Sequence, residues 1–436
     1  MKRLGIFVMM GVGLLAGIAP ATVAAQPGAV ARTKLPNGLT VLVRENPTAP
    51  VVAVSLAVRM GTRWETPETV GISNFLQLMV VRGTVSRSGL QIVEDAERMG
   101  GRIDAVGDVD WSEIAATALS RHSTAILELV ADVALRPTLP EGLIGGVRQF
   151  LLRQVRNRGE QPYPVAFDTL LGSLFGQHPY AWHALGRRQS VERVDRAALL
   201  AHYRRHYVPQ GMVLAVSGRV RTPAVAAEAE RLFGAMPAAP AAAAPAIQPP
   251  GAAASRMVSE VSGAQAQILA GALAPPLTHP DYPAVKVLGT VLGGGMASRF
   301  FSELRDKQGL AYSTDALYPS LVDRGYFVAQ LGTAPENLER AEAALGRELD
   351  RIRLEPPTPE DVRVAKAYLL GRLAMDRRTN ARQAWYLATL ELGGVGHEFL
   401  DRYQAAVLDV GPADVQRVAQ TYLGTLRVSI ARPPTR

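Results

Sequence analysis

The sequence predicts an α+β protein with two similar tandem domains. The chain has 436 residues, which is more than one hydrophobic core usually serves. Residues 236–254 are rich in proline and alanine and contain almost no large apolar side chains, a composition typical of a semi-rigid linker. The segments on either side of this linker have similar lengths and repeat one order of strands and helices, which indicates a duplication.

The repeated plan is a strand region, a helix, and a closing helix followed by a strand. In the first half we predict a pair of strands at Leu39 to Val43 and Val51 to Val58, helices at Gly71 to Thr84 and ending near Tyr207, and a strand at Met212 to Ser217. In the second half we predict strands at Gln265 to Leu273 and Leu426 to Ala431, and helices at Tyr282 to Leu292 and Ala413 to Tyr422.

The first 25 residues have the features of an export signal. Lys2 and Arg3 precede an apolar run from Leu4 to about Ile18, and small residues up to Ala25 offer a cleavage site. A membrane anchor is the alternative, but the run is shorter than the roughly 18 residues that a spanning helix needs. We therefore expect a cleaved signal peptide at 1–25 and a periplasmic or secreted protein without a stable membrane anchor.

Composition excludes several classes of function. The formal net charge is +8, but the basic residues are spread along the chain rather than gathered into a stripe, which argues against nucleic-acid binding. The chain contains no cysteine, so disulfides and thiol chemistry are excluded and only His and carboxylates remain as strong metal ligands.

The segment G-I-S-N-F-L-Q-L-M-V-V-R-G-T, from Gly71 to Thr84, has two faces. Its apolar residues recur at helical spacing and predict a buried face. Asn74, Gln77 and Leu78 share another face with Val81. A carboxamide cannot act as a general base near pH 7, and a leucine offers a metal no lone pair.

Motifs along the chain are similar in order and spacing to those of the insulinase and pitrilysin peptidases of family M16. They are L-P-N-G-L-T-V-L-V-R-E-N (35–46), M-G-T-R-W-E (60–65), the helix at 71–84, G-G-R-I-D-A (100–105), H-P-Y (178–180), Y-V-P-Q-G-M (207–212) and L-G-G-G-M-A-S-R-F-F-S-E-L-R-D-K-Q-G-L-A-Y (292–312). The resemblance implies an N-terminal-type domain at 30–235 and a C-terminal-type domain at 255–434. Each would be a mostly antiparallel sheet packed with helices.

The chain departs from this family at the metal site. Active members carry H-x-x-E-H, in which two histidines bind zinc and the glutamate activates a water molecule. Here Asn74, Gln77 and Leu78 stand at those places. The family's third ligand is a glutamate on a later helix, and its place falls on Gln154. We expect this chain to bind no catalytic zinc.

The second-half motif retains Arg305 and Tyr312. In the family, an arginine and a tyrosine seven residues apart reach a zinc site from the C-terminal-type domain and hold the substrate and the oxyanion. A guanidinium and a phenol suit that role, since both donate hydrogen bonds to negative charge. The alternative is that Arg305 pairs with Asp306 or Glu303 at the surface while Tyr312 fills the core.

The resemblance implies a division of labour between two chains. Some small bacterial members resemble heterodimers in which one chain brings the zinc helix and the other brings the Arg/Tyr pair. We predict a non-metal subunit that joins a homologous M16 chain with an intact H-x-x-E-H and its zinc, and that acts on peptides or unfolded protein. A catalytically inactive scaffold or peptide-binding homologue is the alternative.

Three histidines are further candidates. His202 and His206 lie four residues apart on a predicted helix, which is a spacing that can bridge a metal. Arg204 and Arg205 lie between them and no carboxylate does, so we favour a solvated basic face. His178 precedes a proline, so we favour a turn and packing role for it over a ligand role.

Two glycine-containing segments complete the candidates. Gly293 to Gly295 lack a following G-K-[ST], so a bend before a helix is favoured over phosphate binding. Gly100, Gly101 and Asp104 open an alternating strand that runs toward Trp111. The corresponding edge strand of active M16 members pairs with extended substrate, and a plain sheet edge is the alternative.

Overall fold

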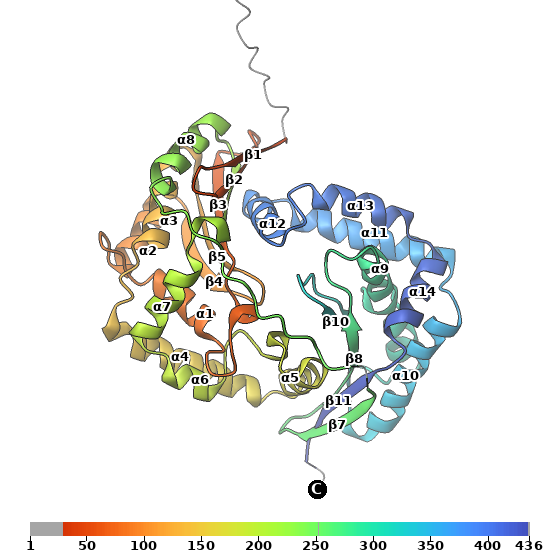
Figure 1. The fold of residues 1–436 in the computed structure, drawn as a ribbon. Coiled ribbons are helices and arrows are strands. Elements are labelled where there is room, and N and C mark those ends of the chain that lie inside the picture. The colour runs from red at the N-terminus through yellow and green to blue at the C-terminus, as the bar shows by residue number, and fades with distance from the viewer. Residues whose placement is uncertain (1–28, 252, 435–436) are drawn as a thin grey trace, which may run out of the picture.

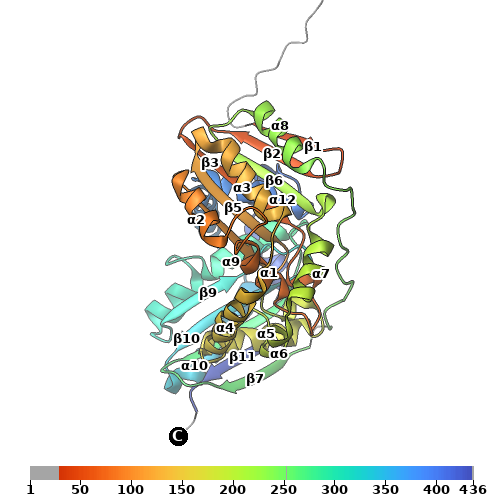
Figure 2. The ribbon, with the colours of Figure 1, turned by 90° about the vertical axis from the view of Figure 1, so that its left-hand side faces the viewer.

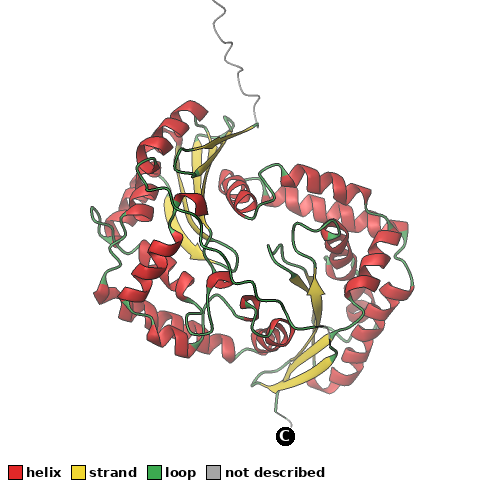
Figure 3. Ribbon diagram, in the orientation of Figure 1, coloured by secondary structure: helices red, strands yellow, loops and turns green. Residues whose placement is uncertain are grey.

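A computed structural model describes residues 29–251 and 253–434 of the chain. The predicted signal peptide lies outside these residues. Each half of the chain builds one sheet with helices against it, and the two layered halves face each other (Figures 1 and 3). The α+β class with two similar domains is therefore confirmed. None of the helices in the described residues is both long and apolar enough to cross a membrane.

The first sheet has six strands in the order β1-β2-β6-β3-β5-β4. Its strands are β1 (Val30–Lys34), β2 (Thr40–Glu45), β3 (Val51–Val58), β4 (Arg102–Gly107), β5 (Ser112–Leu119) and β6 (Met212–Gly218). The predicted pair of opening strands, β2 and β3, do not bond to each other. Strand β6 lies between them, parallel to β2 and antiparallel to β3.

The second sheet has five strands in the order β7-β11-β8-β10-β9. They are β7 (Ser255–Glu260), β8 (Ala266–Ala274), β9 (Ser313–Leu317), β10 (Gly325–Thr333) and β11 (Arg427–Arg432). Here too the closing strand, β11, lies between the first two strands and runs parallel to the first. Apart from the additional edge strand β1, replacing β2, β6, β3, β5 and β4 by β7, β11, β8, β10 and β9 turns the first sheet into the second, as a duplication requires.

Helices cover both sheets. The first half contains α1 (Ile72–Val80), α2 (Gly89–Arg98), α3 (Ser123–Leu135), α4 (Glu141–Gly159), α5 (Pro162–Phe175), α6 (Arg188–Arg193), α7 (Arg196–His206) and α8 (Thr222–Phe233), with 3₁₀ turns at Thr62–Trp64, Ser120–His122, Pro179–Ala181 and Pro209–Gly211. The second half contains α9 (Tyr282–Gly293), α10 (Leu338–Leu354), α11 (Pro359–Asp376), α12 (Asn380–Leu392), α13 (Phe399–Asp409) and α14 (Pro412–Tyr422), a π-helix at Phe300–Lys307 and a 3₁₀ turn at Pro335–Asn337.

The two halves exchange one helix each. Helix α5 of the first half packs on β8 and β11 of the second sheet, and α12 of the second half packs on β3 and β6 of the first sheet. Figure 1 shows α12 beside the first sheet and α5 beside the second. Leu170 of α5 and Leu387 of α12 lie in the two resulting apolar clusters. Each sheet therefore buries one of its faces only when the other half is present.

The predicted linker connects α8 to β7 and runs along one side of the molecule (Figure 2). Residues 236–251, 253 and 254 contain no helix or strand, which agrees with the proline content of the linker. Both halves hold it by hydrogen bonds to its backbone. The Trp64 indole donates to the Ala242 carbonyl (3.0 Å), and Arg427 donates to the Gly251 and Ala253 carbonyls (3.0 Å each).

Candidate functional site

Helix α1 carries the positions of the missing zinc motif, and its start is firmly anchored. The buried Glu65 carboxylate accepts hydrogen bonds from the Gly71 and Ser73 amides (2.8 Å each) and so caps the helix. Gly71 has a φ of 94° and lies close to Gly186, where a side chain would collide with the backbone at 2.6 Å. The scaffold of the family's zinc helix is therefore intact.

The four positions of the family's ligands and base are spread over different environments. Asn74 and Leu78 are half-buried, Gln77 is fully buried, and Gln154 on α4 is exposed. The Gln77 amide donates to the Tyr207 hydroxyl (2.9 Å) and so faces the protein interior. No cluster of three or more His, Asp or Glu side chains suited to a metal exists within residues 29–251 and 253–434. These residues do not fit a zinc ion.

The histidine pair on α7 does not form the solvated face that the sequence predicts. His206 is 1% exposed and its Nδ1 donates to the Arg59 carbonyl (2.9 Å), while His202 Nε2 lies 3.0 Å from the Ser73 hydroxyl. Burial lowers the pKa of His202 to about 3 and that of His206 to about 4, so both imidazoles are neutral at pH 7. The prediction was wrong because the intervening arginines occupy the solvent side of the helix, which leaves His202 beside Ser73 of α1 and His206 beside the Trp64 ring.

Arg305 and Tyr312 lie at the surface of the second half. Arg305 is exposed on the π-helix and its guanidinium stacks over the Phe301 ring, 4.8 Å from the centroid. It has no carboxylate within 4 Å in the part of the chain that the structure describes, since Glu303 binds Lys307 instead. Tyr312 is 59% exposed. The alternative in which Arg305 is paired and Tyr312 fills the core therefore does not hold.

Local backbone features position these two side chains. The π-helix is a rare conformation that is frequent at functional sites. The chain then turns at Gly309, which has a φ of 62°, and the Tyr312 amide donates to the Gly332 carbonyl of β10 (2.8 Å). Tyr312 thus lies directly before the edge strand β9, with its backbone fixed and its side chain in solvent.

The glycine-containing segments lie where the sequence predicts. Gly293 ends α9, Gly295 has a φ of 91°, and the π-helix follows, so this run forms the predicted bend. Strand β4 begins directly after Gly101 and is the edge strand of the first sheet, paired only with β5. Asp104 on β4 is exposed and lies near Arg102 (3.6 Å).

A polar cluster between the halves was not predicted from the sequence. Arg63 binds the Asp323 carboxylate through two hydrogen bonds (2.6 and 2.8 Å), and Tyr180 donates to Asp110 (2.6 Å). The Tyr180 hydroxyl also accepts from the Asp323 amide (3.1 Å). Burial raises the pKa of Asp110 to about 6. The signal was present, because Arg63 belongs to M-G-T-R-W-E and Tyr180 to H-P-Y.

His178 packs against Tyr180 of this cluster. It is 2% exposed, its Nδ1 accepts from the Tyr180 amide (3.1 Å), and its Nε2 lies 4.0 Å from Asp323. Burial lowers the pKa of His178 below its ordinary value. The residue orders a 3₁₀ turn and packs against its neighbours, as predicted.

Comparison with known proteins identifies the family to which this architecture belongs. The profile described as insulinase (peptidase family M16) matches residues 40–187, and the profile described as peptidase M16 inactive domain matches residues 193–369. Together they account for most of the chain. The chain belongs to peptidase family M16. It is a member without the H-x-x-E-H motif, and the second profile begins before α7 rather than at the linker.

The proteins to which this chain is similar in sequence include bacterial proteins that are named zinc proteases. The chain is 25% identical to the uncharacterized zinc protease YmxG of Bacillus subtilis, over 80% of this M16 chain and 85% of the relative. It is 27% identical to the uncharacterized zinc protease Rv2782c of Mycobacterium tuberculosis, over 90% of each chain. The similarity therefore extends over both halves and the linker.

Solved structures share the fold. A peptidase M16 inactive domain from Pseudomonas fluorescens superposes with a TM-score of 0.87 at 23% identity, covering 93% of this chain and 98% of that one. A protease from Helicobacter pylori gives a TM-score of 0.86 at 21% identity, covering 94% and 100%. At these identities the likeness concerns the fold alone.

Proposed function

We propose that this chain is the exported, non-metal subunit of a heterodimeric zinc endopeptidase. Its partner would be a homologous M16 chain with an intact H-x-x-E-H, and the substrate would be a peptide or an unfolded protein. The single observation that carries the proposal is the state of Arg305 and Tyr312. Both side chains are exposed, and Arg305 has no acidic partner within 4 Å among the described residues, although its motif lies in a chain without H-x-x-E-H.

The exposed pair is suited to act on a neighbouring chain. A buried or salt-bridged arginine would have its hydrogen-bond donors occupied, whereas Arg305 presents its guanidinium from a short, irregular helix. Tyr312 presents a phenol from the start of an edge strand. A scaffold has no need of two such donors exposed to solvent.

In the proposed reaction this chain stabilises charge. The partner's zinc would supply the activated water that attacks the scissile carbonyl. Arg305 and Tyr312 would donate hydrogen bonds to the oxygen on which negative charge develops, in a cleft closed by the two subunits. The open edges of β9 and β4 would hold extended peptide by main-chain hydrogen bonds.

Co-expression tests the proposal. The full chain would be produced with an M16 homologue that has an intact H-x-x-E-H, purified as a pair, and assayed on an unfolded protein with and without a chelator. We expect zinc-dependent hydrolysis by the pair and none by either chain alone. Arg305→Ala should lower kcat by about 10²–10³-fold, since it removes one oxyanion donor.

A matched variant and an assembly assay separate the alternatives. Arg204→Ala removes an exposed arginine from the first half and should leave kcat unchanged. Size-exclusion chromatography should show the same heterodimer for both variants. A stable pair without peptidase activity would contradict the proposal and support the scaffold alternative, as would a kcat unaffected by Arg305→Ala.

A further inference from the structure

A cavity of about 1320 Å³ lies between the two halves, and neither Arg305 nor Tyr312 lines it. Helices α9, α11, α12 and α13 form most of its wall, together with β9 and the chain that follows it. Asp110 and Trp111 contribute from the first half. The cavity is therefore built mainly by the second half and is separate from the proposed oxyanion site.

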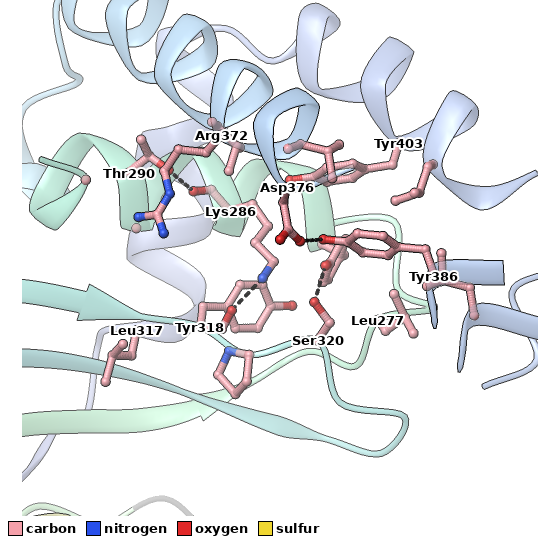
Figure 4. Close-up of a pocket in the computed structure, with 18 of the residues that line it drawn as sticks. Leu277, Lys286, Thr290, Leu317, Tyr318, Ser320, Arg372, Asp376, Tyr386 and Tyr403 are labelled. Carbon is pink, nitrogen blue, oxygen red and sulfur yellow. Dashed lines mark hydrogen bonds between the residues drawn. The ribbon is translucent and has the colours of Figure 1, made fainter. Parts of the chain in front are cut away.

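The Lys286 side chain extends from α9 into this cavity (Figure 4). Its ammonium donates one hydrogen bond, to the Tyr318 carbonyl (2.6 Å), and lies 5.2 Å from the ring centroids of both Tyr282 and Tyr318. Burial lowers the pKa of Lys286 to about 8. An ammonium carries three N–H donors, so two remain for a ligand. The residue is half-buried, and a cation that is partly removed from water without a counter-ion is costly.

The carboxylates that line the cavity are engaged elsewhere. Asp376 accepts from Arg382 (2.6 Å) and from the Tyr386 hydroxyl (2.7 Å), as Figure 4 shows for Tyr386. Asp315 accepts from a backbone amide (2.7 Å), and Asp110 belongs to the polar cluster between the halves. Lys286 has no carboxylate within 4 Å among residues 29–251 and 253–434.

A second cation lines the same cavity. Arg372 on α11 lies over the Tyr368 ring, 5.7 Å from its centroid, and donates a long hydrogen bond to the Tyr368 hydroxyl (3.4 Å). It too lacks a carboxylate within 4 Å in the described part of the chain. In Figure 4, Arg372 and Lys286 approach the cavity from neighbouring helices. Two more arginines line the cavity: Arg382 is paired with Asp376, and Arg378 donates to the Met375 carbonyl. Lys286 and Arg372 thus add to a basic lining that favours an anion inside the cavity.

Much of the rest of the wall is aromatic, with aliphatic side chains between the rings. The rings that line it come from α9, α11, α12, α13, β10, the segment after β9 and the first half, and they are Trp111, Tyr282, Tyr318, Tyr326, Tyr368, Trp385, Tyr386, Phe399 and Tyr403. Such rings bury flat apolar groups and still offer hydroxyls at their edges. A cavity with convergent polar groups in an apolar wall has the make-up of a ligand site.

We propose that this cavity binds a carboxylic acid with an aromatic body, with its carboxylate on the Lys286 ammonium and its ring against the aromatic wall. The acid is either a free small molecule or the C-terminal residue of a peptide, since both present the same group. The binding belongs to this chain alone and does not depend on the proposed heterodimer.

Fluorescence titration of the full, isolated chain tests the proposal. Trp111 and Trp385 line the cavity, and the chain has four tryptophans, so occupancy should change the emission. The probes are N-acetyl-phenylalanine, its C-terminal amide, and Gly-Gly-Phe with a free or an amidated C-terminus. We expect the acids to bind roughly tenfold to hundredfold more tightly than the matching amides, because only the acids make charge-assisted hydrogen bonds.

Variants identify the cation. Lys286→Met keeps the length of the side chain and should weaken binding of the acids roughly tenfold or more while leaving the amides unaffected. Lys34→Met, on the exposed strand β1, is the matched control and should change nothing. Arg372→Gln alters an exposed residue, so it tests the second cation without risk to the core, and should weaken the acids to a smaller extent.

Each outcome decides the proposal. Tighter binding of Gly-Gly-Phe than of N-acetyl-phenylalanine assigns the site to peptide C-termini, and equal binding assigns it to small acids. Equal affinity for acids and amides, no binding at millimolar concentration, or a Lys286→Met variant that is folded and binds acids normally would overturn it. Loss of peptidase activity in the heterodimer assay would not affect these results.

Discussion

The two halves of the chain share one topology and differ in what they do with it. Helix α1 in the first half packs against the edge strand β4 and against α4 and α7, while α9 in the second half packs against the edge strand β9 and against α11 and α14. In the first half, α1 lacks the H-x-x-E-H motif. In the second half, a cavity lies beside α9, the helix equivalent to α1.

The comparison teaches how a duplicated framework can lose one chemistry and keep another. Gln77 turns inward to Tyr207, so α1 serves packing. Lys286 on α9 and the Arg305/Tyr312 pair beyond it remain directed toward cavity and solvent. The cationic groups to which we assign a function therefore lie in the second half.

We expect the largest loss of stability from substitutions in the exchanged helices α5 and α12. Leu170→Ala on α5 and Leu387→Ala on α12 should each lower the free energy of unfolding by about 2–5 kcal/mol, because each deletes a buried side chain between the halves. Urea denaturation measures both. Leu354→Ala, at a 77% exposed position, should stay within about 0.5 kcal/mol. A large effect on one side alone would show that the exchange is not reciprocal.

The polar cluster between the halves should make stability depend on pH. The pKa of Asp110 is raised to about 6 from an ordinary 3.8, so the folded state binds the proton more tightly than the unfolded state. This contribution, about 3 kcal/mol, is fully present below pH 4 and is lost as the pH rises through 6. Urea titrations from pH 4 to 8 should show this decline in the wild type and not in Asp110→Asn. Parallel profiles would contradict it.

The inward hydrogen bond of Gln77 predicts a smaller change in the free energy of unfolding. Gln77→Leu should cost about 1–3 kcal/mol, because it leaves the buried Tyr207 hydroxyl without its partner. Adding Tyr207→Phe should restore most of that stability, since both polar groups are then gone. Thermal or urea unfolding of the two single variants and the double variant completes the cycle. Additive losses would mean that the two side chains do not depend on each other.

Much of the fold could be predicted from local patterns. Strand β3 spans the predicted Val51 to Val58. Helix α14 begins one residue before its predicted start, and α9 begins at its predicted start. These segments have strong periodicity and clear ends. The pairing of β2 with β6 could not be predicted, because partners in a sheet are set by tertiary contacts between distant segments.

Some features of the candidate site could be predicted from the sequence, and others could not. The absence of zinc ligands and the retention of Arg305 and Tyr312 follow from residue identity, so the sequence contains them. The inward position of His206 does not, because helical spacing alone cannot say which face of α7 meets α1. The cavity around Lys286 is also missed, since its wall comes from segments up to about 300 residues apart.

By itself, the amino-acid sequence determined the two-part organisation, the family and the chemistry that α1 has lost, because each depends on residue type and order along the chain. Only the tertiary structure decided that the halves exchange helices, that the histidines of α7 are buried, and that Lys286 faces a cavity. Those features depend on which surfaces meet when both halves fold together, and burial of apolar faces from opposite ends of the chain selects them.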